Sequence, residues 1–190
     1  MRKGLFIMLL LVAGGQLWLG CYIPAKAQLA QWLLQRAWRQ GEMQQTAIHP
    51  WPWADISPVA RLQLPQRHID LIVLNGDSGA ALAFGPGLRQ LDASDRITMI
   101  SGHRDTQFQF LQHLHKQEAI DLLYRDGEKQ HYHVVEQTIV DSRTPLQLQA
   151  SDTPLLILVT CYPFNAIQPG GSLRYLVIAQ RSVTPASPTT

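Results

Sequence analysis

The chain has 190 residues, which is enough for one domain with a hydrophobic core and a smaller element at one end. Its formal net charge is only +2 and it has no arginine-rich or lysine-rich tract, so nothing indicates a nucleic-acid partner. Apolar residues make up 46% of the chain, an ordinary share for a globular protein with a core.

The N-terminus combines two basic residues with a long apolar run. Arg2 and Lys3 precede an apolar stretch from Leu5 to about Ile23 that is interrupted only by Gln16. About 20 apolar residues span a bilayer as a helix, and basic residues at its start favour a cytoplasmic N-terminus. We therefore expect residues 1–25 to be a membrane anchor in the lipid bilayer, with the rest of the chain exported.

Two other interpretations of this segment also lead to export. The sequence "AKA" at Ala25–Ala27 has the small-x-small form of a signal-peptide cleavage site, but the apolar stretch is long for a signal peptide. A lipoprotein site at Cys21 is the third option, and the bulky Trp18 three residues before it argues against that site. An uncleaved anchor is the interpretation that the length favours.

Residues 26–58 are predicted to be a helical stalk followed by a linker rich in proline and tryptophan. Apolar residues recur at helical spacing from Ala27 to Gln40, and Gly41 is a natural stop. Pro50, Pro52 and Pro58 then forbid regular helix. The linker tryptophans, Trp51 and Trp53, are expected to cover part of the domain surface.

Short β-type runs separated by turn signals follow Pro58. The strands that we predict are Val59–Leu64, His68–Leu74, Ala80–Phe84, Arg96–Ser101, Ile120–Arg125, Gln130–Val140, Leu155–Thr160 and Leu173–Gln180. One helical insert fits Thr106–Gln117. Eight short strands within residues 59–182 predict an all-β barrel or sandwich, and the polar tail 183–190 is expected to be disordered.

The only cysteine outside the N-terminal segment is Cys161, at the end of a predicted buried strand. Cys21 lies inside or at the edge of the first apolar segment and is a poor disulfide partner for it. A lone thiol in an oxidising compartment is a liability unless it is used, which favours a functional cysteine. The alternative is a core residue, because cysteine is among the most buried residue types.

A nucleophilic cysteine needs an ionisable partner and donors for the oxyanion that forms on attack at a carbonyl. His103 follows a strand that ends at Gly102, and Arg174 stands just inside the last strand, thirteen residues after Cys161. We expect these three residues to meet at the barrel rim. Taken singly, His103 could instead be a loop histidine and Arg174 a surface residue of an edge strand.

The segment "LILVTCYPF", followed by "SLRYLVIAQ" and preceded by "SGHRD", resembles the sortase family. The family's cysteine motif is Thr-Leu-x-Thr-Cys; Leu158, Thr160 and Cys161 match it, while Ile157 replaces the first threonine. The resemblance covers roughly Val59–Gln180 and implies an eight-stranded sortase-like barrel. A further segment, "HPWPWADISPVARL", resembles the sortases of Gram-negative bacteria and implies a single-pass protein of the inner membrane with its catalytic domain in the periplasm.

The resemblance implies a membrane-anchored cysteine transpeptidase that needs no cofactor. Cys161 would attack a C-terminal sorting signal similar to Leu-Pro-x-Thr-Gly and form a thioester acyl-enzyme, which an amine acceptor of unknown identity then resolves. His103 would protonate the departing amine and deprotonate the incoming one. Arg174 would donate hydrogen bonds to the oxyanion or substrate backbone, and Thr160 would position substrate and oxyanion.

Two alternatives remain open. An exported cysteine peptidase would hydrolyse the same kind of signal with water in place of the amine. The second alternative is a non-enzymatic, metal-binding periplasmic β-domain. It is suggested by His131 and His133, which form a His-x-His pair on one predicted strand face. No further ligand cluster completes a zinc site, and calcium stays unassigned although Asp141 and Asp152 flank the loop before the cysteine strand.

Overall fold

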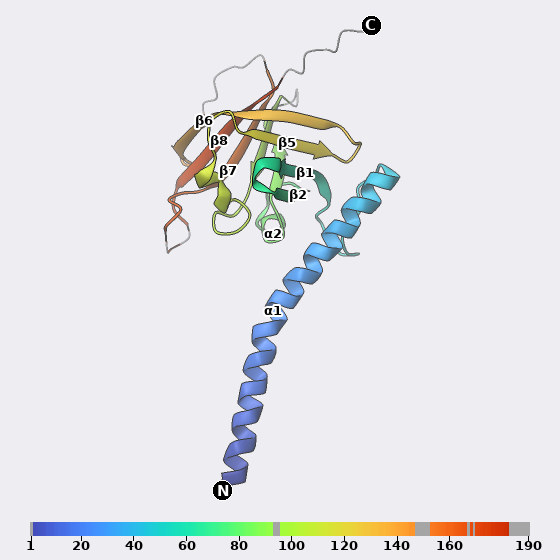
Figure 1. The fold of residues 1–190 in the computed structure, drawn as a ribbon, viewed down its shortest axis with the longest axis vertical. Helices are drawn as coiled ribbons and strands as arrows, with labels where there is room; N and C mark the ends of the chain where they lie inside the picture. The colour runs from blue at the N-terminus through green and yellow to red at the C-terminus, as the bar shows by residue number, and fades with distance from the viewer. Residues whose placement is uncertain (1, 93–95, 147–152, 167, 169, 183–190) are drawn as a thin grey trace.

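The computed structural model describes residues 2–92, 96–146, 153–166, 168 and 170–182. Within the first 23 residues it describes the side chains of Gln16, Gly20 and Tyr22 only. A single helix, α1 (Arg2–Gln44), leads into a β-barrel and extends well beyond it, as Figure 1 shows.

Among the described residues, eight strands and three short helical segments follow α1. The strands are β1 (Pro58–Leu64), β2 (Ile69–Asn75), β3 (Gly87–Gln90), β4 (Ile97–Ser101), β5 (Ala119–Tyr124), β6 (Lys129–Asp141), β7 (Leu155–Cys161) and β8 (Leu173–Arg181). The helical segments are η1 (Pro65–Arg67), α2 (Gly79–Leu82) and η2 (Gln109–His113).

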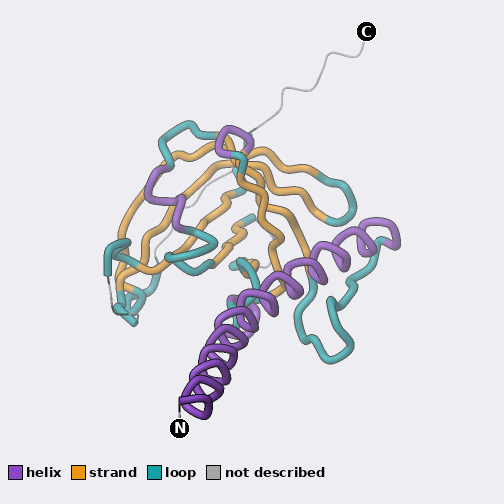
Figure 2. The backbone as a smooth tube through the Cα atoms, turned by 60° about the horizontal axis from the view of Figure 1, so that its bottom comes forward, coloured by secondary structure: helices purple, strands orange, loops and turns teal. Residues whose placement is uncertain are grey.

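The strands close into one barrel in the order β1-β2-β3-β4-β7-β8-β6-β5, with β5 pairing back onto β1. Figure 2 shows this closed arrangement, with α1 lying outside the barrel. Most neighbours are antiparallel, whereas the β2–β3 and β4–β7 pairs are parallel. The predicted eight-stranded all-β barrel is thereby confirmed.

Apolar side chains fill the barrel interior. Strand β7 is buried from Leu155 to Leu158, because it lies between β4 and β8 rather than at an edge. Ile100, Leu156 and Leu158 belong to the same cluster as Phe108 from the connection after β4, and all four are fully buried. This packing fixes the ends of β4 and β7 relative to one another.

One predicted strand was wrong. Residues 79–82 form α2 instead, since the Ser78 side chain caps the helix by accepting a hydrogen bond from the backbone N–H of Ala81 (3.2 Å). The strand of this region is β3, which starts at Gly87. A Cβ at Gly87 would lie 2.1 Å from the carbonyl oxygen of Gly76, so only glycine permits the parallel contact with β2.

The predicted helix Thr106–Gln117 shrinks to η2, one short 3₁₀ segment. Phe108, Leu111 and Leu114 recur every three residues and are all buried in the barrel core. Their backbone groups follow the same period, because Leu111 N donates to Phe108 O and Leu114 N to Leu111 O. The core therefore selects the 3₁₀ spacing over the α-helical one.

The stalk helix packs on the barrel through its C-terminal part. Leu34 and Trp38 are each 1% exposed and contact Ile56, Ile72 and Leu74. Gly41 does not stop the helix as predicted. The end comes at Gln44, where Gln45 adopts a left-handed conformation (φ 52°) and Thr46 N donates to Gly41 O at 3.3 Å.

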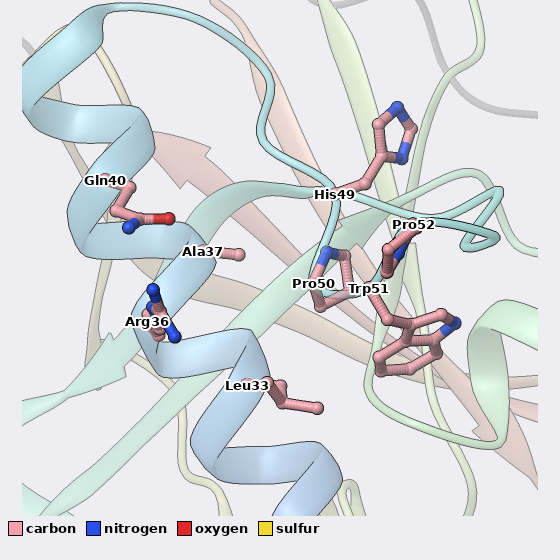
Figure 3. A pocket seen from close by; sticks show the side chains of 8 residues that line it. All are labelled: Leu33, Arg36, Ala37, Gln40, His49, Pro50, Trp51 and Pro52. Carbon is pink, nitrogen blue, oxygen red and sulfur yellow. The ribbon is translucent and has the colours of Figure 1, made fainter.

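The two linker tryptophans behave differently. Trp51 packs edge-to-face on Phe84, with ring centroids 5.1 Å apart, whereas Trp53 is 83% exposed and does not cover the surface as expected. Between Trp51 and α1 lies a cleft of about 370 Å³, lined on the helix side by Leu33, Arg36 and Ala37 (Figure 3).

In the part of the chain whose side chains are described, no helix is long and apolar enough to cross a membrane. The apolar run predicted as the anchor, Leu5–Ile23, lies outside that part apart from three side chains. The predicted disordered tail, residues 183–190, also lies outside the described residues.

Candidate active site

The parallel pairing of β4 with β7 brings the histidine loop to the cysteine. The register runs from Ile97 opposite Leu155 to Ser101 opposite Val159. Extending it by two residues places His103 at the level of Cys161. The backbones stay in contact at this point, because Gly102 N donates to Val159 O (3.1 Å).

A buried hydroxyl reinforces the same contact. Thr160 is 2% exposed, and its Oγ1 donates a hydrogen bond of 2.7 Å to the carbonyl oxygen of Gly102. The bond joins the residue before Cys161 to the residue before His103. The backbone that precedes each of the two candidate residues is therefore held in place at the ends of neighbouring strands.

Arg174 approaches Cys161 from the other side. Strands β7 and β8 are antiparallel, and the Cα partner of Cys161 is Arg174. Residues that are directly opposed on antiparallel strands point to the same face of the sheet. The registers thus place Cys161 between His103 and Arg174, at one rim of the barrel.

The thiol and the two flanking side chains are accessible. Cys161 is a free, partly exposed cysteine, and His103 is exposed. The guanidinium of Arg174 donates from Nη1 to Gly171 O (2.6 Å) and Leu173 O (2.9 Å). Both of these bonds come from one nitrogen, so the other donors of the guanidinium can turn toward a substrate at Cys161.

The loop that carries His103 is held by its own residues. The backbone N–H of His103 donates to Gln107 Oε1 (2.9 Å), and the backbone oxygen of His103 accepts from Phe108 N (2.9 Å). Phe108 is fully buried, and a Cβ at Gly102 would lie 2.8 Å from its ring. Gly102 therefore lets the Phe108 ring enter the core close against the backbone at the start of the loop.

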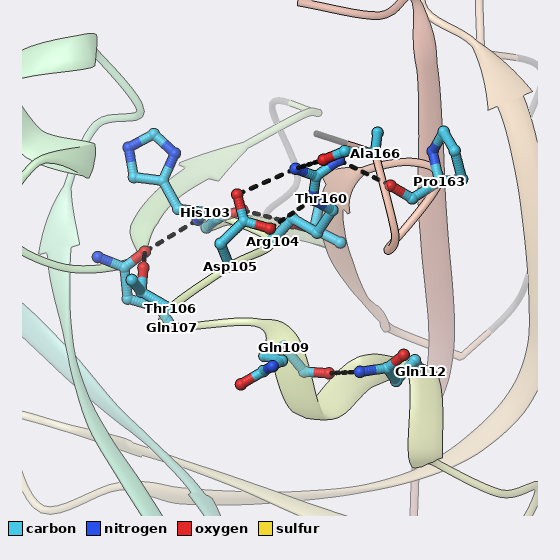
Figure 4. A network of polar contacts seen from close by, with 11 residues as sticks. His103, Arg104, Asp105, Thr106, Gln107, Gln109, Gln112, Thr160, Pro163 and Ala166 are labelled. Atoms are coloured by element: carbon cyan, nitrogen blue, oxygen red, sulfur yellow. Dashed lines mark hydrogen bonds and ion pairs between the residues drawn. The ribbon is translucent and has the colours of Figure 1, made fainter. Parts of the chain in front are cut away.

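Sequence reasoning missed Arg104, which belongs to the same site. It is 8% exposed and donates to the backbone oxygens of Pro163 and Ala166, just beyond the cysteine (Figure 4). A hydrogen bond to Asp105 raises the pKa of Arg104 and lowers that of Asp105. The only signal in the sequence was an arginine between a candidate histidine and an aspartate in "GHRD".

Three aromatic rings cluster near the end of β7, and two of them, Phe164 and Tyr175, pack against the barrel core. Phe164 and Tyr175 pack edge-to-face with centroids 5.2 Å apart, and Tyr162 stacks on Tyr175 at 6.2 Å. Tyr175 lies opposite Thr160, and burial raises the pKa of its hydroxyl.

The residues considered for metal binding make other contacts. His131 Nδ1 pairs with Asp121 Oδ1 (2.8 Å), and His133 Nδ1 lies 3.1 Å from Ser182 Oγ. Among the described residues, no group of three or more histidine, cysteine or acidic side chains is placed to hold a metal ion. The carboxylate of Asp141 pairs with Arg143, while Asp152 lies outside the described residues.

Comparisons with known proteins agree on one family. A family model described as "Sortase domain" matches residues 62–182. Sortase D of Bacillus subtilis is 31% identical over 125 residues, which is 63% of this chain and 62% of the relative's length. The chain therefore spans less than two thirds of that relative.

Solved structures show the same fold. Sortase A from Corynebacterium diphtheriae superposes with a TM-score of 0.58 at 24% identity, covering 72% of this chain and 66% of the other. Sortase C of Clostridium perfringens, solved with the C-terminal cell wall sorting motif, gives 0.58 at 17% identity and covers 84% and 91%.

The bond from Thr160 to Gly102 can be tested with a matched pair of substitutions. Thr98 is also 2% exposed, and its hydroxyl bonds Gln90 at the opposite end of β4. Loss of a buried hydrogen bond costs about 1–3 kcal/mol of unfolding free energy, so Thr160→Val and Thr98→Val should both destabilise the protein. Only Thr160→Val should change the rate at which iodoacetamide alkylates Cys161 in the folded protein with Cys21→Ser.

Chemical denaturation and alkylation monitored by intact mass measure the two effects separately. Equal alkylation rates in both variants would contradict a role for Thr160 in placing the thiol.

Proposed function

The chain belongs to the sortase family, and from that premise we propose that it is a membrane-anchored cysteine transpeptidase. Its substrate would be a protein with a C-terminal sorting signal similar to Leu-Pro-x-Thr-Gly. The observation that carries the proposal is the position of Cys161 at a strand end between His103 and Arg174.

In the first step, the thiolate of Cys161 attacks a backbone carbonyl carbon of the signal. The resulting tetrahedral intermediate carries an oxyanion and collapses to a thioester as the peptide C–N bond breaks. His103, as imidazolium, gives its proton to the departing amine. In this proposal the exposed ring turns toward the thiol and the leaving group.

In the second step, an amine attacks the thioester carbonyl. His103, now neutral, takes the proton of this amine, and Cys161 leaves as thiolate. Water in place of the amine gives a free carboxylate instead, so hydrolysis is the expected side reaction. A dedicated peptidase is the alternative that differs only in this second nucleophile.

Two further residues support the reaction, one by binding the oxyanion and one by holding the strand ends. Arg174 carries a permanent charge and a planar set of donors, which suits it to bind the oxyanion rather than to transfer a proton. Thr160 is buried and donates to Gly102, so we assign it an indirect role through the position of the strand ends.

The substrate class rests on the family and on one relative. The sortase C structure of Clostridium perfringens was solved with the C-terminal cell wall sorting motif. We extend that class of substrate to this chain. The acceptor is an amine whose identity we leave open.

Location is the third part of the proposal. The apolar run Leu5–Ile23 behind Arg2 and Lys3 supports a single-pass membrane anchor with the barrel on the far side of the membrane from the cytoplasm. The resemblance of "HPWPWADISPVARL" to the sortases of Gram-negative bacteria supports the finer proposal that the membrane is an inner membrane and the barrel lies in the periplasm. Protein isolated from carbonate-washed membranes should carry its complete N-terminus, whereas a mature N-terminus at Gln28 would show cleavage.

The nucleophile is tested by Cys161→Ala. Incubating the full chain with a library of sorting-signal peptides and amine acceptors should yield a covalent acyl-enzyme and transfer products, both visible by mass spectrometry. Cys161→Ala should abolish both while keeping the melting temperature, since a partly exposed cysteine at a rim packs little volume. Retained transfer by this variant would refute the assignment.

Arg174→Lys tests the oxyanion donor. Lysine keeps the charge but loses the planar fork, and removing one preorganised oxyanion donor costs about 100-fold to 1,000-fold in rate. Arg181→Lys is the control, because Arg181 lies farther along β8 and pairs with Glu128 at 3.1 Å. Near-parent turnover in Arg174→Lys with an unchanged melt would mean that another group binds the oxyanion.

A further inference from the structure

The guanidinium of Arg104 joins two loops that are distant in sequence. Its Nη1 donates to Pro163 O (2.7 Å) and its Nη2 to Ala166 O (2.8 Å), both in the segment that follows Cys161. The backbone of Arg104 follows His103 directly. One side chain therefore connects the histidine loop to the cysteine loop, as the dashed lines in Figure 4 show.

Asp105 fixes the orientation of this guanidinium. Nε donates to Oδ1 at 2.6 Å and Nη2 to Oδ2 at 3.0 Å, which is a two-point contact along one edge of the group. Four hydrogen bonds then hold a charge that is 8% exposed. Such burial is costly without partners, so the full set of acceptors explains why the guanidinium stays in place.

Two cross-links therefore enclose the reacting pair. On one side, Thr160 Oγ1 bonds Gly102 O, which joins the residues that precede Cys161 and His103. On the other side, Arg104 bonds the backbone that follows Cys161. With both in place, neither loop can move away from the other without breaking buried hydrogen bonds.

The electrostatic environment agrees with this geometry. The hydrogen bond to Asp105 is the main cause that raises the pKa of Arg104, and the negative charge of a Cys161 thiolate adds to it. The guanidinium thus lies within electrostatic reach of the sulfur, although its hydrogen bonds go to backbone oxygens and to Asp105.

We propose that Arg104 is a positioning residue for the reaction, which sets the separation of the His103 imidazole and the Cys161 thiol by tying their two loops together. The inference rests on the proposed function, in which the Cys161 thiolate attacks the substrate and His103 transfers the protons. Arg104 contributes mainly through geometry rather than charge. Its planar guanidinium can donate in fixed directions to two carbonyl oxygens and one carboxylate at the same time, which a point charge cannot do.

The variant that separates geometry from charge is Arg104→Lys. Lysine keeps the positive charge and cannot hold both carbonyls and Asp105 in fixed directions. Since a misplacement of about 1 Å can cost about 100-fold in rate, kcat for peptide cleavage should fall at least about ten-fold while KM changes little. Arg61→Lys is the matched control, because Arg61 makes the same two-point contact with Asp70 on β1 and β2.

A second measurement does not depend on the identity of the substrate. The alkylation rate of Cys161 by iodoacetamide, followed against pH in the Cys21→Ser background, reports how the imidazole and thiol influence each other's ionisation. In Arg104→Lys the midpoint of this profile should move by about half a pH unit or more, because coupling between two titrating groups depends on their separation. The midpoint in Arg61→Lys should stay in place.

The outcomes are distinct. A shifted midpoint in Arg104→Lys supports the proposal even if no tested peptide is cleaved, in which case the proposed function alone is in doubt. A parent-like kcat and midpoint in Arg104→Lys would overturn it. A lower melting temperature with an unmoved midpoint in the folded protein would also overturn it, since Arg104 would then serve stability only.

Discussion

The parallel pairing of β4 with β7 is the constraint on which the site depends. The two strands are separated in sequence by β5, β6 and their connections, so no hairpin brings them together. Side chains alternate along a strand, and a slip of one residue would turn His103 to the opposite face from Cys161. The buried residues Ile100, Leu156 and Leu158 oppose such a slip, because it would expose part of the core.

Polar groups at the rim complete what the core begins. Apolar packing places the strand ends, but it cannot hold the loops beyond them, where backbone groups no longer belong to a ladder. The hydroxyl of Thr160 and the guanidinium of Arg104 hold these loops by hydrogen bonds to backbone oxygens, and both residues are almost fully buried. The side chains of Cys161 and His103 stay accessible, so buried groups hold the loops while the candidate reacting groups face solvent.

The sequence was sufficient where local patterns agreed with the final packing. Seven of the predicted strands correspond to observed ones, since turn signals and β-type runs coincide with barrel strands. The predictions failed in two short segments. Residues 79–82 are apolar enough for a strand, but the Ser78 cap makes them helical. Strand β3 was missed because it depends on the close contact of Gly87 with the backbone of Gly76, which is not adjacent in sequence.

The site divides in the same way. The meeting of His103, Cys161 and Arg174 at one rim could be predicted, because strand ends and residue chemistry are visible in the sequence. Arg104 could not, since its carbonyl partners lie about sixty residues farther along the chain and backbone oxygens leave no sequence signal. These contacts of Arg104 can be recognised only in the folded barrel.

The most direct test of the account is whether positions 103 and 161 are neighbours in the folded protein. Adjacent strands lie about 4.8 Å apart, which falls within the Cα separation of about 4.4–6.8 Å that a disulfide requires. In the Cys21→Ser background, mild oxidation of His103→Cys should therefore consume both thiols in an intramolecular disulfide with Cys161. The exposed control His115→Cys should keep both thiols free. Two free thiols in the His103→Cys protein would contradict the arrangement of strands from which the site is built.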